Sequence, residues 1–293
     1  MATEHRAPPE TLVEDVPAAP AGYEIRPLRT EEDFRHCVDL QEEVWGTGFT
    51  ERVGVALLKV SVRLGGIAAG AWDAGGRLTG FVFGVTGIED GRAVHWSDML
   101  AVRTGVRDGG LGFALKAYQR RELLRRGITT CYWTFDPLES RNAYLNLGKL
   151  GATVGEYVVN MYGESDSPLH RGIGTDRFVA LWALDSPRVE ARLSGADRPP
   201  PPGVCHDLPV AIDVEDEEGL PSPLETHELA GASRLLVPIP TDIQAVKARD
   251  PALALVWRLV VREVLAARLA EGFRVVELLR GGALSHYLVE RPR

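Results

Sequence analysis

The sequence predicts an α/β protein with a mixed sheet and helices on both of its faces. A run of short apolar segments with strand-like spacing is followed by a strand–helix–strand–helix–strand order in the middle of the chain. A proline-rich segment then separates this part from a second, shorter series of strands around one long helix. With 293 residues, the chain is long enough for one large domain and a smaller one.

The first part of the chain begins with a strand, two helices and a hairpin. Asp73-Ala74-Gly75-Gly76 supplies the glycine-bearing turn of that hairpin. The expected elements are a strand over 23–28, helices over 31–45 and 51–64, and strands over 67–72 and 78–88.

The central unit follows with alternating strands and helices. Its elements are a strand over 94–102, a helix over 111–126, a strand over 128–135, a helix over 141–145, and strands over 154–161 and 177–184. On the first of these helices, apolar residues recur at helical spacing from Leu111 to Tyr118. Lys116, Gln119, Arg120 and Arg121 fall between them and are expected to face outward.

Prolines set the expected domain boundaries. Pro187 and the run 199–202 predict a stiff linker over 186–206 that sustains neither a helix nor a central strand. We therefore expect a disordered leader over 1–20, a first domain over 21–185 and a C-terminal α+β unit over 207–293. That last unit is predicted to contain strands over 208–214 and 234–239, a helix over 251–270, and a hairpin of 273–279 with 286–289.

Composition excludes several classes of function. The formal net charge of −8 argues against a broad nucleic-acid footprint. The apolar runs are too short to span a bilayer, and the N-terminus lacks a basic end followed by an apolar core, so a cytoplasmic location is expected without a membrane partner. The cysteines, Cys37, Cys131 and Cys205, lack metal-ligand spacing and suit a reducing compartment, and no metal is expected.

A glycine-rich turn between the strand 94–102 and the next helix is the main functional motif. It reads Arg107-Asp108-Gly109-Gly110-Leu111-Gly112, with the spacing Arg-x-x-Gly-x-Gly. Bare backbone N–H groups at a helix N-terminus, together with the positive end of the helix dipole, favour a phosphate. A dinucleotide fingerprint is disfavoured because it needs Gly-x-Gly-x-x-Gly and an acidic residue about 20 positions later.

With this loop after a strand that ends Leu100-Ala101-Val102, the chain resembles the GNAT superfamily of acyl-CoA-dependent N-acyltransferases. The resemblance covers roughly 23–184 and continues through the strand 128–135 and the helix after it. Three short stretches, 133–138, 160–163 and 175–178, are similar to a long-chain bacterial subgroup of predicted acetyltransferases, part of which is associated with succinylating amino acids. The C-terminal unit then resembles a degenerate second GNAT half. Because it lacks a phosphate loop, it would serve as a lid, a substrate wall or the contact of a homodimer.

The resemblance implies a GNAT-like fold and a set of residues for the co-substrate, which is acetyl-CoA or another acyl-CoA such as succinyl-CoA. The backbone of Leu100, Ala101 and Val102 would contact the pantetheine arm and the thioester oxygen, and Asn142 would cap its helix or contact the co-substrate. The pyrophosphate would lie on Arg107, Asp108, Gly109, Gly110, Leu111 and Gly112. The arginines after Gln119 form either a solvated helix face or a contact for the 3′-phosphate of CoA.

Acyl transfer to an amine also needs a proton acceptor. Asp98 is the first candidate and His95 the second. In a regular strand the two face opposite sides, although a bulge would change this, and each also has a purely structural interpretation. The position where many members place a tyrosine as general acid is Leu147, so Tyr144, one helical turn earlier, is the substitute candidate.

The acceptor is expected to be a small-molecule amine. Arg177 would clamp a carboxylate if that amine is an amino acid, and Asn160 would orient the substrate; an ion pair and a loop hydrogen bond are their structural alternatives. The alternatives to acetyl transfer are N-succinyl transfer to an amino acid and an acyl-CoA-binding regulator without turnover.

Overall fold

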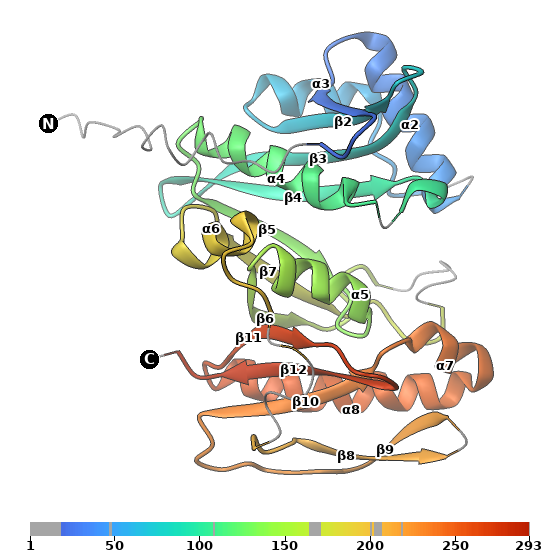
Figure 1. Cartoon of the computed structure of the whole chain (residues 1–293), viewed down its shortest axis with the longest axis vertical. Helices are drawn as coiled ribbons and strands as arrows, with labels where there is room; N and C mark the ends of the chain where they lie inside the picture. The colour runs from blue at the N-terminus through green and yellow to red at the C-terminus, as the bar shows by residue number, and fades with distance from the viewer. Residues whose placement is uncertain are drawn as a thin grey trace, which may run out of the picture. The chain divides into compact units, whose positions relative to one another are not determined.

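The computed structural model describes residues 19–46, 49–107, 109–163, 171–199, 201, 207–217 and 219–292 (Figure 1). They form two compact units. The first comprises the chain up to Trp133 together with Ala183–Ala196, and the second comprises Thr134–Trp182 and Asp197–Arg293. The sequence analysis instead placed a boundary at 186–206. The difference arises because the strand 153–158 pairs with the C-terminal strand 274–279, so the two belong to one unit.

The first unit contains a mixed sheet, which confirms the predicted α/β class. Its strand order is β1-β2-β3-β4-β5, with antiparallel pairing from β1 to β4 and parallel pairing of β5 with β4. The strands are β1 (Tyr23–Pro27), β2 (Ile67–Asp73), β3 (Leu78–Glu89), β4 (Arg92–Val102) and β5 (Thr130–Phe135). The last two residues of β5 belong to the second unit.

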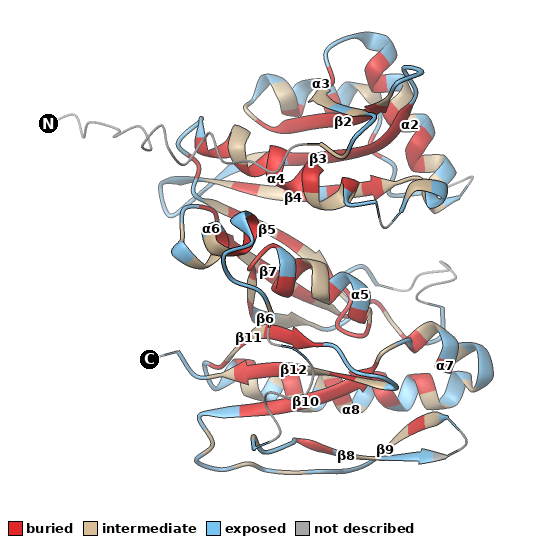
Figure 2. Ribbon diagram, in the orientation of Figure 1, coloured by how far each residue is buried: buried red, intermediate tan, exposed pale blue. Residues whose placement is uncertain are grey.

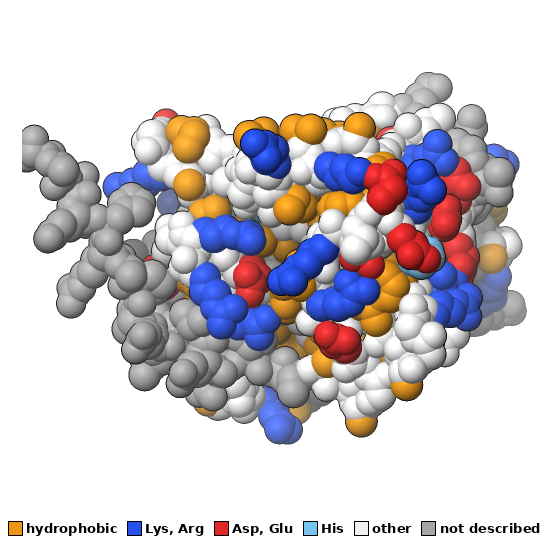
Figure 3. All heavy atoms as spheres, turned by 90° about the horizontal axis from the view of Figure 1, so that it is seen from above, with side chains coloured by type: hydrophobic (Ala, Val, Ile, Leu, Met, Phe, Trp, Pro, Cys, Tyr) orange, Lys and Arg blue, Asp and Glu red, His pale blue; other side chains and the backbone are white. Residues whose placement is uncertain are grey.

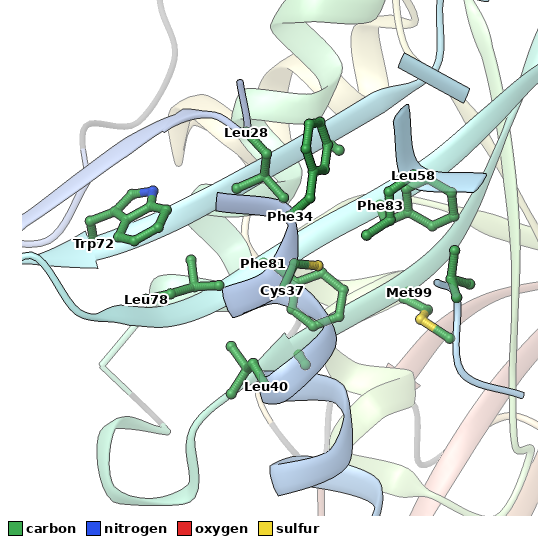
Figure 4. Close-up of a cluster of buried hydrophobic side chains, with 13 residues drawn as sticks. Leu28, Phe34, Cys37, Leu40, Leu58, Trp72, Leu78, Phe81, Phe83 and Met99 are labelled. Atoms are coloured by element: carbon green, nitrogen blue, oxygen red, sulfur yellow. The ribbon is translucent and has the colours of Figure 1, made fainter. Parts of the chain in front are cut away.

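Helices cover both faces of this sheet. On one face, α2 (Glu31–Trp45) and α3 (Val55–Arg63) pack against β3 and β4, and Phe34, Leu58 and Phe81 meet in one buried cluster (Figure 4). On the other face, α4 (Leu111–Leu124) packs so that Leu115 lies beside Gly80, the neighbour of Phe81. Because successive strand residues point to opposite faces, α4 and α2 lie on opposite sides of the sheet. Between β4 and α4 lies one 3₁₀ turn, η1 (Thr104–Val106).

The second unit has its own strand order, β7-β6-β11-β12-β10, with a separate β8-β9 hairpin. Its strands are β6 (Thr153–Val158), β7 (Arg177–Ala183), β8 (Ile212–Glu217), β9 (Leu220–Thr226), β10 (Arg234–Pro240), β11 (Arg274–Leu279) and β12 (Leu284–Glu290). Its helices are α5 (Ser140–Ala143), the π-helix η2 (Tyr144–Lys149), α7 (Ile243–Arg249) and α8 (Pro251–Ala270). The strands β2, β11 and β12 and the first half of β3 are mainly buried, whereas the outward-facing residues of the helices are exposed (Figure 2).

One helix corrects the prediction that 186–206 sustains no helix. Within this segment, α6 (Pro187–Ser194) forms because Pro187 occupies the first helical position, where no N–H donor is needed. Ser186 caps the helix by accepting a hydrogen bond from Val189 N, and Gly195 ends it in the left-handed conformation. Residues 1–18 of the leader predicted over 1–20, and the segment 202–206, lie outside the described residues.

The surface of the first unit carries both signs of charge. Figure 3 shows Lys and Arg side chains interspersed with Asp, Glu and apolar side chains on one face. Glu31 pairs with Lys59 and Arg35, and Arg52 pairs with Glu42. Such pairs neutralise one another locally, so this part of the surface has no broad field of one sign.

Candidate active site

A bulge in β4 shapes the candidate site. Met99 pairs with Phe83 of β3 and Trp96 with Val85, so the two residues Ser97 and Asp98 stand opposite the single residue Gly84. One extra residue reverses the alternation of side chains along a strand. His95, before the bulge, and Ser97, its first residue, contact α4, whereas Met99 and Ala101, after the bulge, belong to the buried cluster beneath α2 and α3.

Gly84 is glycine because the bulge leaves no room for a side chain. A Cβ atom built there would overlap Nε2 of His95 and the carbonyl oxygen of Trp96. The close approach of β3 to the bulge therefore requires a residue without a side chain.

Asp98 lies at the exposed side of the bulge. Partial removal of its carboxyl group from water raises its pKa above the ordinary value, and the negative charge of Glu51 raises it further. Within the described part of the chain, no hydrogen-bond donor or cation is seen on this carboxyl group. A carboxylate in this state can accept a proton from a ligand.

His95 has a different environment. The residue is 0% exposed, its Nδ1 lies 3.1 Å from Oγ1 of Thr86, and its Nε2 lies 3.1 Å from Nε2 of Gln119. Burial lowers its pKa to about 3, and the charges of Lys116 and Arg126 act in the same direction. The imidazole is therefore neutral, and both of its nitrogens are already engaged within the protein.

Three polar residues of α4 correct the prediction that they face outward. Lys116, Gln119 and Arg120 are buried, at 2%, 0% and 3% exposure. Lys116 Nζ donates to Oγ of Ser97 at 2.9 Å, and Arg120 Nε donates to the carbonyl oxygen of Leu184 at 2.6 Å. The prediction was wrong because α4 is covered on more than one side, so polar residues beside its apolar stripe are enclosed too.

The glycine-rich loop joins the end of β4 to α4. Gly110 is the residue before the first turn of α4 and has the left-handed φ of 82°, which favours glycine. The fold does not require glycine at position 112, because a Cβ atom there would lie 3.9 Å from its nearest neighbour, Cδ2 of Leu100, which is an ordinary van der Waals contact. Arg107 Nε donates to the carbonyl oxygen of Val102 at 3.1 Å, whereas Asp108 lies outside the described residues.

The remaining predicted co-substrate and acid candidates belong to the second unit. Asn142 Oδ1 accepts a hydrogen bond from Asn146 at 3.3 Å. Tyr144 begins the π-helix, and the guanidinium of Arg280 lies 5.1 Å from the centroid of its ring. Leu147, at the usual tyrosine position, is fully buried.

The two predicted substrate residues also have partners within the second unit. Asn160 has a φ of 47°, and its Oδ1 accepts from Thr175 N at 3.3 Å. Arg177 Nη1 donates to the carbonyl oxygen of Asp176 at 2.9 Å, and its guanidinium lies 5.1 Å from the ring centroid of Tyr162. The hydrogen bond of Asn160 is its structural alternative, and Arg177 has the alternative ion pair as well, with Nη1 3.8 Å from Oδ2 of Asp136. The binding roles of Asn160 and Arg177 stay predictions.

The sequence analysis missed two ion pairs, one buried and one partly buried. In α8, Nη2 of Arg258 donates hydrogen bonds to both carboxylate oxygens of Asp136, at 2.6 Å to Oδ2 and 2.8 Å to Oδ1. One helical turn later, Arg262 binds the carboxylate of Asp176, with Nε donating to Oδ2 at 2.8 Å and Nη2 to Oδ1 at 3.0 Å. The four-residue spacing of two arginines was the available signal, but nothing in the sequence indicates which carboxylates they meet.

Two buried thiols are unsuited to nucleophilic catalysis. Burial raises the pKa of Cys37 to about 12 and that of Cys131 to about 11, so both are protonated near neutral pH. Cys205 lies outside the described residues. Over the ranges given above, no group of three or more metal-ligating side chains is found, and no helix is long and apolar enough to cross a membrane.

No protein-family model and no curated protein matches the sequence. Among solved structures, it is similar to a GCN5-related glucosamine N-acetyltransferase region in a fungal multi-domain GH3 β-N-acetylglucosaminidase, with 20% identity and a TM-score of 0.32. That match covers 39% of this chain and 14% of the other.

Two further similarities cover nearly the whole of the other chain. One is to a chain of the NatC complex bound to Gag peptide and CoA, with 15% identity, a TM-score of 0.45, and coverage of 55% of this chain and 98% of that one. The other is to the ribosomal-protein-S18-alanine N-acetyltransferase from Escherichia coli, with 16% identity, a TM-score of 0.44, and coverage of 56% and 95%.

Proposed function

We propose that the protein is an acyl-CoA-dependent N-acyltransferase of GNAT type, which moves an acyl group from CoA to a primary amine by direct transfer. One observation carries the proposal. A single strand, β4, contains the bulge that exposes Asp98 and leads from Val102 through the loop 107–112 into the N-terminus of α4. A proton acceptor and an anion-binding helix end thus flank one short stretch of backbone, Leu100 to Val102.

The helix end fits the phosphates of an acyl-CoA. The first N–H groups of α4 lack partners within their own helix and attract an anion. Gly112 supports this assignment, because the fold itself leaves room for a side chain at that position. A side chain there would instead hold a phosphate away from the backbone donors. Arg107, the first residue of the loop, can add charged hydrogen bonds.

The proton acceptor in this proposal is Asp98 rather than His95. An amine with a pKa of roughly 8 to 10 must lose a proton before it attacks, at a cost on the order of 1 to 5 kcal/mol at neutral pH. The Asp98 carboxylate can take that proton directly or through a water molecule. His95, with a pKa of about 3 and both nitrogens engaged, is poorly suited to this task.

The remaining steps of the acyl transfer, stabilisation of the oxyanion and departure of the thiolate, need less help from side chains. A backbone N–H of the stretch 100–102 would stabilise the oxyanion. The CoA thiolate, with a reference pKa near 8.5, leaves without much protonation, so the buried Leu147 is no obstacle and Tyr144 stays the acid candidate. The elevated pKa values of Cys37 and Cys131 support direct transfer over an acyl-cysteine intermediate.

The donor in this proposal is acetyl-CoA, with succinyl-CoA as the alternative, and the acceptor is a small-molecule amine. If the acceptor is an amino acid, Arg177 is the residue proposed to hold its carboxylate, with Asn160 beside it on the chain segment that precedes β7.

The proposal is tested first by ligand-dependent thermal unfolding. A ligand at 100 times its dissociation constant stabilises a protein by about 2.7 kcal/mol. We expect acetyl-CoA, succinyl-CoA and free CoA to raise the melting temperature and NAD to leave it unchanged. If none of the CoA species shifts unfolding, the loop is only a turn and the proposal is lost.

The pH dependence of the reaction follows from the state of Asp98. Because its pKa is raised, the acid limb of kcat/KM should lie at higher pH than an ordinary carboxyl group would give. Activity should fall as the pH decreases through this limb, since protonated Asp98 cannot accept a proton. Glu51→Gln removes a negative charge and should move the limb to lower pH. A limb that stays in place would remove Glu51 from this account.

A further inference from the structure

Lys116 is a buried cation that the proposed chemistry does not use. Its ammonium donates 2.9 Å hydrogen bonds to Oγ of Ser97 and to Oε1 of Gln119, and it lies 3.9 Å from the ring centroid of Trp133. The residue is 2% exposed, and its pKa is lowered to about 8 by burial. Burying a cation is unfavourable, so these contacts compensate a substantial desolvation cost.

The contacts of Lys116 lead directly into the bulge of β4. Ser97 is the first of the two residues that stand opposite Gly84, and Asp98 is the second. An extra residue in a strand has no ladder position of its own, so it needs other contacts to hold one conformation. The hydrogen bond from Lys116 to Ser97 is such a contact.

A second branch contacts the same strand at His95, two residues before Ser97. With its Oε1 accepting from Lys116, the amide of Gln119 presents Nε2 as a donor to Nε2 of His95. The proton of His95 is then on Nδ1 and is donated to Oγ1 of Thr86, whose hydroxyl donates to the carbonyl oxygen of Gly65 at 2.9 Å. One chain of hydrogen bonds thus runs from the ammonium of Lys116 through β4 and β3 to Gly65, two residues after the end of α3.

We propose that Lys116 is a positioning residue for the acyl transfer: through Ser97 and the Gln119–His95 chain it holds the β4 bulge in the conformation that presents Asp98. This inference rests on the function proposed above. Lys116 itself is enclosed and does not touch the reactants. It should therefore affect kcat while leaving acyl-CoA affinity, which depends on the loop 107–112, unchanged.

The test compares kcat with the dissociation constant for acetyl-CoA in the full-length protein. Lys116→Met keeps an apolar side chain of similar length but removes the ammonium, and Ser97→Ala removes only the acceptor on the bulge. We expect each to lower kcat by about 10- to 100-fold, the range typical of a misplaced catalytic group, with acetyl-CoA affinity within twofold of wild type. Lys59→Met, which removes an exposed lysine of α3, is the matched control and should change neither.

The effects of the two substitutions on kcat should also be non-additive, because both disrupt the same hydrogen bond. The double variant should have the kcat of Lys116→Met alone. If Lys116→Met does not fold, Ser97→Ala decides the question. A folded Ser97→Ala with wild-type kcat overturns the inference, and so does a loss of acetyl-CoA affinity that matches the loss of kcat.

A spectroscopic measurement separates this inference from the proposed function. In ¹⁵N-histidine-labelled protein, with the signal assigned by His95→Gln, His95 should be protonated on Nδ1 in wild type, where Thr86 accepts that proton. In Lys116→Met, Gln119 loses the ammonium that orients its amide, so the Nε2 resonance of His95 should shift. An unchanged Nε2 resonance overturns the network. Absence of turnover in wild type with every amine tested overturns the proposed function itself, whereas equal turnover in wild type and both variants overturns only the role of Lys116.

Discussion

Replacement of Gly110 by glutamate should abolish acyl-CoA binding. Gly110 has a left-handed φ of 82° directly before α4, a conformation that a residue with a Cβ adopts only at a cost of roughly 1–2 kcal/mol. The new carboxylate would also stand at the helix end that is proposed to attract phosphates, where it repels them. We expect the affinity for acetyl-CoA, measured by calorimetry, to fall by at least about 100-fold, which corresponds to about 2.7 kcal/mol.

Two further variants separate loss of binding from loss of folding. Gly91→Glu adds the same charge at a similar φ of 76°, but in the turn between β3 and β4, at the opposite end of β4 from the loop. It should bind acetyl-CoA as wild type does. Gly112→Ala fits the fold without a close contact and should weaken binding while the melting temperature stays unchanged. Unchanged affinity in Gly110→Glu would show that the site lies elsewhere.

Asp98→Asn should spare acyl-CoA binding and reduce turnover. The amide keeps the size of the side chain but cannot accept a proton from the ammonium. General-base catalysis contributes about 10²- to 10⁴-fold to enzymatic rates, so kcat should fall within that range. The measurement is kcat as a function of pH, together with the dissociation constant for acetyl-CoA.

The pH profile distinguishes a base from a residue that merely shapes the bulge. The acid limb of wild type should disappear in Asp98→Asn, and the remaining rate should rise with pH as the free amine becomes more abundant. Asp39→Asn, which alters an exposed aspartate of α2, should leave the profile unchanged. If Asp98→Asn had the rate and the acid limb of wild type, Asp98 would not be the proton acceptor.

Elements with local signals could be predicted closely from the sequence. The helix predicted over 31–45 has these bounds in the structure because Thr30 and Asp33 form a capping box at its start. The helix over 251–270 is likewise fixed by Asp250, which caps it, and by Pro251 at its first position. In both cases the residues that begin the helix act within one turn.

Features that depend on contacts distant in the sequence could not be predicted in this way. The β4 bulge lies opposite Gly84 of β3 and accepts a hydrogen bond from Lys116 of α4, and the alternation of β4 residues alone does not show either contact. Lys116 was assigned to the surface because it is charged, although its ammonium finds Ser97 and Gln119 inside. The ion pair of Asp136 with Arg258 joins residues 122 positions apart.

The order of the elements around the proposed site could be predicted from the sequence because these elements are consecutive along the chain. The strand end at Val102, the loop and the start of α4 are contiguous, so their order shows in the sequence. The choice between Asp98 and His95, in contrast, depends on what surrounds each side chain. His95 is enclosed by α4 and β3, whereas Asp98, the second residue of the bulge, is exposed.

The central claim is acyl transfer to an amine, and a coupled product assay tests it most directly. Purified protein is incubated with acetyl-CoA or succinyl-CoA and a panel of primary amines that includes amino acids, and free CoA and acylated amine are both quantified. The account predicts CoA release matched one to one by an acylated amine, lost in Gly110→Glu and reduced in Asp98→Asn. Acyl-CoA binding without any acylated amine across the panel would contradict it and would identify a non-catalytic acyl-CoA-binding protein instead.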